Sequence, residues 1–158
     1  MYPASAAVRP YDAGDRASII SIWRRSSEIG HPFLTDHQLA LQQHLVETVY
    51  LDQSEIWIAS VEGQPAAFIG LIDGYIGALF VDTPARGLGY GSLLLRHAIR
   101  LKGALSLEVY EQNRQATDFY LRHGFRITRR AEQDSLGFPH PALTMTRPAQ
   151  PEDLSEDL

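Results

Sequence analysis

The chain has 158 residues, a length that fits a single domain with a buried core of its own. It contains no cysteine, so disulfide frameworks, thiol nucleophiles and thiolate metal sites are excluded. The net charge of −5 and the scattered arginines argue against a nucleic-acid partner and mildly favour a cationic ligand.

The N-terminal third of the chain predicts a short edge strand followed by two helices. Residues 8–11 include a proline, which an edge strand tolerates. Asp15 can cap a first helix that ends near Ser27, and Thr35 begins a capping box for a second helix through Val49.

From residue 55 onward, apolar and alternating runs predict strands, and amphipathic runs predict two more helices. The predicted strands are residues 56–61, 66–72, 75–81, 105–110, 125–131 and 142–146. The predicted helices are residues 92–102 and 113–122, each closed by a glycine.

This order of elements predicts an α+β or mixed α/β fold. Consecutive strands in the middle favour antiparallel pairing, and the helix that joins 75–81 to 105–110 favours a parallel pair. We expect one domain over residues 1–146. Residues 147–158 contain two prolines and an acidic end, so we expect a disordered tail there.

Arg86-Gly87-Leu88-Gly89-Tyr90-Gly91 lies between the predicted strand 75–81 and the predicted helix 92–102. Glycines let a turn expose its backbone N–H groups at close range, because no side chain stands in front of them. The following helix adds its first N–H groups and the positive end of its dipole. Such a turn is suited to phosphate, so the sequence predicts binding of a phosphorylated small molecule.

Three kinds of phosphate-binding turn compete for this motif. A Walker loop requires lysine and serine or threonine after its last glycine, whereas Ser92-Leu93 follows here, which excludes it. A dinucleotide-binding fingerprint matches nearly, with Glu108 at the distance of a ribose-binding acid. Residues 82–85 separate the strand from the turn, however, and the chain lacks the alternation of a doubly wound sheet, so NAD binding is the weaker alternative. The third pattern, Arg/Gln-x-x-Gly-x-Gly/Ala, is matched in full.

At this motif the chain resembles the GNAT superfamily of acetyl-CoA-dependent N-acetyltransferases. A second block at 111–125 is similar to the family's Asn-x-x-Ala-x-x-Phe-Tyr-x-x-x-Gly-Phe segment, and the resemblance covers roughly residues 8–146. Residues 132–141 look like those of small bacterial members with poorly defined substrates. The resemblance implies a mostly antiparallel central sheet with splayed fourth and fifth strands, flanked by about four helices. Acetyl-CoA, the cosubstrate, is expected between the splayed strands.

The same resemblance assigns cofactor contacts to three segments. Backbone groups of the fourth strand are expected to pair with pantetheine amides, and the glycine turn to take the pyrophosphate. Asn113 is expected to hydrogen-bond cofactor amides or to cap its own helix. The implied acetyl-CoA-binding residues are Leu79, Phe80, Val81, Arg86, Gly87, Leu88, Gly89, Tyr90, Gly91, Ser92, Asn113, Ala116 and Phe119.

Tyr120 occupies the family's general-acid position. A phenol remains protonated at neutral pH and can donate a proton to the departing CoA thiolate. The alternative is a tyrosine that only packs on the sheet between Phe119 and Phe125. A matching alternative for the whole chain is a non-catalytic domain that binds acyl-CoA or regulates another protein.

The acceptor amine and its general base are not singled out by the sequence. Small amines, amino acids, aminoglycosides and the N-termini or lysines of proteins all stay open. The expected acceptor-site residues are Glu28, His31, Phe33, Glu108 and His140, with Glu132 and Asp134 as further candidates for the base.

Other partners and the location are predicted from the absence of signals. The six histidines contain no close pair with metal-ligand spacing, so we expect no metal. No run is apolar enough for a membrane span or a signal peptide, so we expect no membrane partner and a cytoplasmic location. Members of the resembled family often form homodimers, and the sequence leaves the oligomeric state open.

Overall fold

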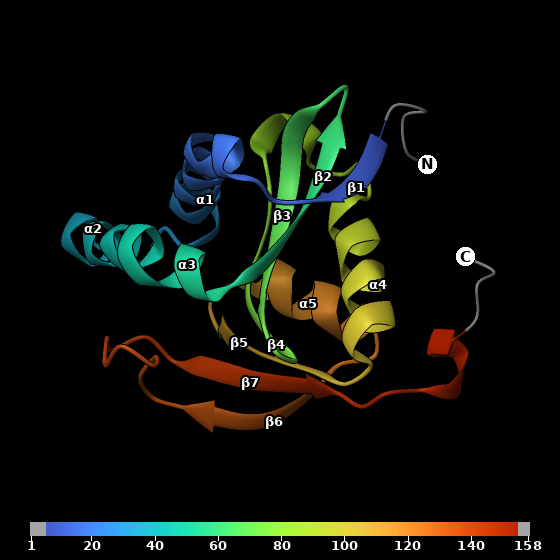
Figure 1. Ribbon diagram of the computed structural model, residues 1–158. Coiled ribbons are helices and arrows are strands. Elements are labelled where there is room, and N and C mark those ends of the chain that lie inside the picture. The colour runs from blue at the N-terminus through green and yellow to red at the C-terminus, as the bar shows by residue number, and fades with distance from the viewer. Residues whose placement is uncertain (1–5, 155–158) are drawn as a thin grey trace.

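The computed structural model describes residues 6–154, which form one seven-stranded sheet with helices on both faces (Figure 1). The strands are β1 (Ala6–Pro10), β2 (Glu55–Val61), β3 (Gln64–Ile72), β4 (Tyr75–Val81), β5 (Leu105–Tyr110), β6 (Arg126–Ala131) and β7 (Ala142–Arg147). Their order across the sheet is β1-β2-β3-β4-β5-β7-β6. Only β4 and β5 are parallel among these pairs, as the helical crossover between them predicts.

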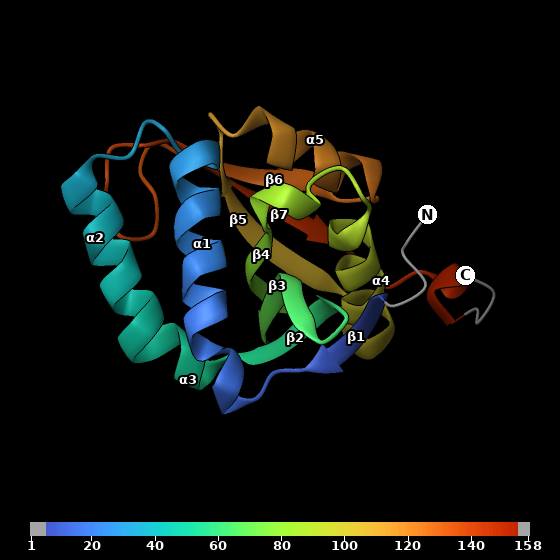
Figure 2. The ribbon, with the colours of Figure 1, turned by 90° about the horizontal axis from the view of Figure 1, so that it is seen from above.

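The helices form two layers, one on each face of the sheet (Figure 2). One layer contains α1 (Arg16–Gly30), α2 (Asp36–Leu45), the π-helical segment η2 (Val46–Tyr50) and α3 (Leu51–Gln53). The other contains α4 (Tyr90–Lys102) and α5 (Arg114–Arg122). Three 3₁₀ turns complete the description, namely η1 (Ala13–Asp15), η3 (Thr83–Ala85) and η4 (Pro151–Leu154).

Side chains alternate between the two faces of the sheet along each strand, and they contribute to a separate apolar cluster on each face. In β3, Phe68 packs with α1 residues such as Ile22, whereas Ile69 packs with α4 residues such as Leu94. Successive side chains of a strand point to opposite faces, so one central strand supplies both clusters. In the part of the chain that the structure describes, no helix has the length and apolar character needed to cross a membrane.

The two central parallel strands separate soon after they begin. β4 and β5 pair only at Tyr75↔Ser106 and Ile76↔Leu107, although β4 continues to pair with β3 as far as Val81. The end of β4 therefore has a sheet neighbour on one side only. This confirms the expected splay of the fourth and fifth strands, and it leaves backbone groups of β4 available to a ligand.

Some boundaries differ from the predicted ones. The second helix does not stop near Val49 but continues through η2 into α3, and β7 extends to Arg147. The expectation of disorder over 147–158 differs from the structure at residues 147–154. There the Arg147 Nη2 and Asp153 Oδ1 atoms lie 2.8 Å apart in a buried ion pair, which prolines and acidic residues alone do not foretell. Residues 155–158 lie outside the described residues.

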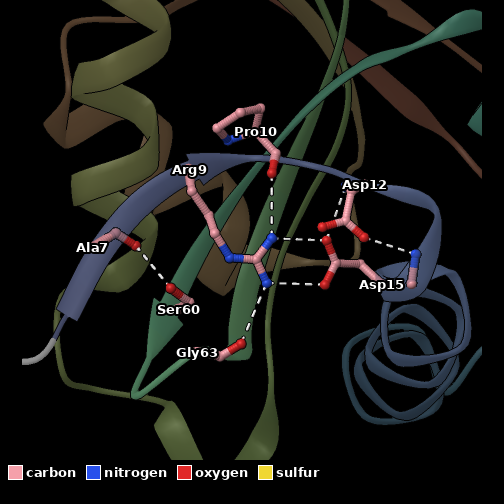
Figure 3. Close-up of polar contacts among 8 residues, drawn as sticks. Ala7, Arg9, Pro10, Asp12, Asp15, Ser60 and Gly63 are labelled. Atoms are coloured by element: carbon pink, nitrogen blue, oxygen red, sulfur yellow. Dashed lines mark hydrogen bonds and ion pairs between the residues drawn. The ribbon is translucent and has the colours of Figure 1, made fainter.

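Asp15 is the N-cap residue of α1, as predicted, but its side chain makes no capping hydrogen bond to that helix and faces Arg9 (Figure 3). The side chain of Asp12 accepts a hydrogen bond from Gly14 N at 2.8 Å and begins the turn instead. Asp15 is buried and takes two hydrogen bonds from Arg9, Nη1 to Oδ2 at 2.8 Å and Nη2 to Oδ1 at 2.9 Å. Arg9 therefore connects the edge strand β1 to the start of α1.

We expect Asp15→Asn to lower the free energy of unfolding by about 1–3 kcal/mol, because a charge-assisted, largely buried pair loses one partner. The hydrogen bonds from Arg9 hold the pKa of Asp15 below its ordinary value of 3.8. This contribution is present above that value and is lost as the pH falls through the folded-state pKa. Urea denaturation of wild type and variant across this acid range tests the expectation. Asp52→Asn, at an exposed position, is the matched control, and equal losses in both variants would contradict it.

Candidate active site

The glycine turn adopts the backbone conformation that its sequence requires. Gly87 and Gly89 have φ angles of +79° and +91°, in the region that favours glycine. Gly89 is also the N-cap of α4, so the N–H groups of the helix start point back into the turn. A Cβ on Gly91 would lie 3.5 Å from Phe119 Cζ and 3.6 Å from Val81 Cγ2, so the helix start, α5 and β4 approach closely here.

A cavity of about 400 Å³ lies against this turn, the end of β4 and the start of α5. We call it the cofactor cavity. Its lining contains every predicted acetyl-CoA-binding residue except Leu88, which is exposed. Its members from that set are Leu79, Phe80, Val81, Arg86, Gly87, Gly89, Tyr90, Gly91, Ser92, Asn113, Ala116 and Phe119.

The cofactor cavity has the groups that a CoA moiety needs. The unpaired edge of β4 offers amide partners for pantetheine, the helix start offers N–H groups for pyrophosphate, and Phe119 offers an apolar wall. Arg86 is oriented by a 2.8 Å hydrogen bond from Nη2 to Gln115 Oε1. Gln115 and Arg122 also line the cavity, and sequence reasoning missed both although they belong to the helix of the second motif.

Tyr120 lies on α5 at the junction of two cavities, the cofactor cavity and the larger one described below. Its ring is buried and makes edge contacts with Phe119 and Phe125, at centroid distances of 5.2 Å and 5.3 Å. Burial raises the pKa of the Tyr120 hydroxyl above its ordinary value of 10.0, so the group stays protonated. The predicted packing contacts are present, and they hold a proton donor next to both cavities.

Asn113 caps α5 and at the same time orients His31. Its Oδ1 accepts a hydrogen bond from Ala116 N at 3.2 Å, so its Nδ2 faces His31 Nε2 as the donor, also at 3.2 Å. The proton of His31 is then carried by Nδ1. Burial lowers the pKa of His31 to about 4. His31 is therefore a neutral ring that accepts at Nε2, which argues against a general base at neutral pH.

We expect the His31 ring to remain neutral, with its proton on Nδ1, well below the ordinary histidine pKa of 6.5. Protonation is easier in the unfolded chain, so this group costs stability as the pH falls from 6.5 towards 4. Long-range ¹H–¹⁵N NMR spectra of the imidazole nitrogens measure both the tautomer and the titration. The exposed His37 is the reference in the same spectra. Protonation of His31 near pH 6.5 would contradict this assignment.

The second cavity, of about 430 Å³, opens between the α1–α3 layer and the splayed strands. We call it the acceptor cavity. Glu108 lines it from β5, and Asp134 lines it from the connection between β6 and β7. Tyr110 joins the walls, because its hydroxyl donates to Asp134 Oδ2 at 2.6 Å and accepts from Gln42 Nε2 at 2.8 Å.

An aromatic cluster of His31, Phe33, Tyr110 and His140 lies beside this cavity; His31 and Tyr110 line it, whereas Phe33 and His140 do not. Tyr110 lies 5.0 Å from His31 and 5.1 Å from Phe33, and Phe33 lies 5.2 Å from His140, between ring centroids. His140 Nε2 is 2.9 Å from Gln38 Oε1 on α2. The structure thus brings together three residues predicted from sequence, and it adds Tyr110, which shares a face of β5 with Glu108.

Glu28 does not join the other predicted acceptor-site residues. Its side chain is exposed, lines neither cavity and pairs with Arg24, Nε to Oε2 at 3.0 Å. Helical periodicity explains this placement, because residues four apart share a face of α1, and Arg24 on that face also donates from Nη1 to Gln43 Oε1 of α2 at 2.9 Å. The expectation that Glu28 faces the acceptor is therefore corrected.

The comparison with known proteins agrees with this geometry. The model of the acetyltransferase (GNAT) domain matches residues 52–127. The peptidyl-lysine N-acetyltransferase YjaB of Salmonella typhimurium is 39% identical over 82% of this chain and 90% of its own length.

Two solved structures share the fold. The solution structure of apo YjaB from Escherichia coli superposes with a TM-score of 0.82 and 34% identity, covering 92% of this chain and 99% of that one. PaiA N-acetyltransferase from Thermoplasma acidophilum, solved with coenzyme A, has a TM-score of 0.71 and 17% identity, covering 91% and 99%. At that identity the second likeness concerns the fold alone.

Proposed function

Because this chain belongs to the GNAT family of acetyl-CoA-dependent N-acetyltransferases, we propose that it acetylates a primary amine by direct transfer where the two cavities meet. The observation that carries the proposal is the position of Tyr120, which lines both cavities and stays protonated. Acetyl-CoA enters from the side of the glycine turn and the amine from the side of Glu108.

The reaction forms a bond between the amine nitrogen and the acetyl carbon, and it breaks the bond between that carbon and the CoA sulfur. Backbone N–H groups near Phe80 and Val81, on the free edge of β4, stabilise the negative oxygen of the intermediate. The electron pair of the broken bond goes to sulfur, and Tyr120 protonates the thiolate. A thiol has a pKa of about 8.5, so the buried phenol of Tyr120 is a weaker acid than the CoA thiol. The phenol nevertheless carries its proton at neutral pH and has it available for the thiolate.

The composition supports transfer without an acetylated enzyme. The chain contains no cysteine to act as a thiol nucleophile. The amine must reach the acetyl group in its neutral form, so its ammonium proton passes to water in the acceptor cavity. His31 is not suited to take that proton, because its Nε2 is occupied by Asn113 and its pKa is low.

We propose a lysine side chain of a peptide or protein as the acceptor. The YjaB relative of Salmonella typhimurium carries the name peptidyl-lysine N-acetyltransferase, and the acceptor cavity is largely apolar and lined by the carboxylates of Glu108 and Asp134. Such a cavity fits a long methylene stem that ends in a cation.

An initial-rate assay of CoA release over a panel of amines tests the proposal. The panel contains lysine peptides, free amino acids, a polyamine and an aminoglycoside, and the mass of each product identifies the acetylated amine. We expect turnover on a lysine peptide. Binding of acetyl-CoA without turnover on any amine would instead support a non-catalytic acyl-CoA-binding domain.

A further inference from the structure

The acceptor cavity contains a carboxylate whose charge is not balanced by a neighbouring cation. Glu108 and Asp134 line it, and no lysine or arginine among the described residues does. His31 supplies no charge there, since burial keeps it neutral. A cation that balances this cavity must therefore come with the substrate.

The two carboxylates differ in how many further hydrogen bonds their oxygens can accept. Asp134 is fully engaged, because Tyr110 Oη donates to its Oδ2 and the backbone N–H groups of Leu136 and Phe138 donate to its Oδ1, at 3.0 Å and 2.8 Å. Glu108 Oε1 receives one long hydrogen bond of 3.3 Å from Ser135 N, and its Oε2 has no hydrogen-bond partner in residues 6–154. Glu108 is the carboxylate that can accept bonds from an ammonium group.

The mouth of the same cavity carries exposed apolar side chains. Tyr50, Ile72, Tyr75 and Leu136 are between 37% and 42% exposed, and all four line the cavity. They come from η2, β3, β4 and the connection before β7, so four separate segments form one rim. Ile72 and Tyr75 are direct cross-strand partners, which fixes their spacing.

Exposed apolar side chains around a cavity indicate that an apolar part of the bound substrate covers them. Isolated exposed apolar residues are ordinary, but a group that surrounds one cavity marks a binding surface. The lysine stem fills the cavity itself, so the rim can contact only the residues on either side of that lysine in a polypeptide. Free lysine and small amines have no such residues.

We propose that Glu108 binds the ammonium of an acceptor lysine, and that the rim of Tyr50, Ile72, Tyr75 and Leu136 selects lysines flanked by bulky apolar residues. This inference rests on the proposed acetyl transfer. To the acetyl transfer it adds two determinants of specificity: Glu108 recognises the charge of the lysine, and the rim recognises the residues on either side of it.

Peptides of equal length test both features, with a central lysine flanked either by leucine or by serine and with both ends blocked. For wild type we expect a kcat/KM about tenfold higher with leucine flanks, a discrimination of the size that apolar pockets achieve. Ile72→Ala and Tyr50→Ala are expected to remove most of that preference, by lowering kcat/KM for the leucine-flanked peptide more than kcat/KM for the serine-flanked one.

Glu108→Gln is expected to raise KM for both peptides by about tenfold or more and to leave acetyl-CoA affinity unchanged. Glu62→Gln, the same change at an exposed turn outside both cavities, is the matched control. Equal rates on the two peptides would overturn the rim assignment, and an unchanged KM in Glu108→Gln would overturn the ammonium site. If wild type acetylates other amines but neither peptide, this inference fails and the transfer stands. If it acetylates no amine, the proposed function itself fails.

Discussion

Tyr120→Phe is expected to lower kcat for acetyl transfer by about 100-fold or more, a size typical of losing one general acid. The variant removes one oxygen from a buried ring and keeps its contacts with Phe119 and Phe125. The CoA thiolate must then leave unprotonated or take its proton from water, so the loss falls on the chemical step. The dissociation constant of acetyl-CoA should change by less than about twofold, because the hydroxyl is not needed for binding.

Steady-state kinetics and calorimetric titration with acetyl-CoA separate these two quantities. Tyr11→Phe is the matched control, since Tyr11 packs against the apolar cluster that contains Ile22 and Phe68 and lines neither cavity. A kcat for Tyr120→Phe close to that of wild type, with intact acetyl-CoA binding, would mean that Tyr120 only packs.

Gly89→Asp is expected to weaken acetyl-CoA binding by about 100-fold or more. The substitution places a carboxylate at the N-cap of α4, where the pyrophosphate is expected, so two anions compete for the same N–H groups. The residue also has a φ of +91°, a conformation that costs any side-chain-bearing residue free energy. Charge repulsion and backbone strain act in the same direction.

Gly63→Asp separates the loss of the site from a general effect on stability. Gly63 has a φ of +82°, a Cβ there meets nothing within 4 Å, and it lies outside both cavities in the turn between β2 and β3. It therefore carries the same strain and the same charge away from the site. Calorimetry should find acetyl-CoA binding kept in Gly63→Asp and lost in Gly89→Asp, with no NAD binding in wild type. Equal affinities in both variants would contradict the assigned pyrophosphate position.

Local patterns in the sequence predict most of the fold. The alternating and apolar runs predict the strands to within a few residues, and the crossover helix after Val81 predicts the parallel pairing of β4 with β5. The glycine turn was predictable because its conformation depends on residues that are adjacent in the chain. The cofactor cavity follows from that turn and the second motif, so twelve of the thirteen predicted contact residues line it.

Features that depend on distant residues were not predictable in the same way. Asp15 occupies the N-cap position of α1 as local rules predict, but its side chain binds Arg9 on β1 instead of the helix, and Asp12 caps the preceding turn η1. The hydrogen bonds of Tyr110 with Gln42 and Asp134 join three separate segments of the chain, and no spacing in the sequence predicts them. Glu28 was assigned to the acceptor side because it lies near the helix end, and only the orientation of α1 turns it outward.

Intact-mass spectrometry after a single turnover tests direct transfer to a lysine more directly than any variant does. The enzyme, in excess over acetyl-CoA, is mixed with a leucine-flanked lysine peptide and quenched at several times. We expect one acetyl group on the lysine ε-amine, formed at the rate at which CoA appears, and an unmodified enzyme at every time. Bound acetyl-CoA with no acetylated peptide, or an acetyl group that appears first on the enzyme, would contradict it.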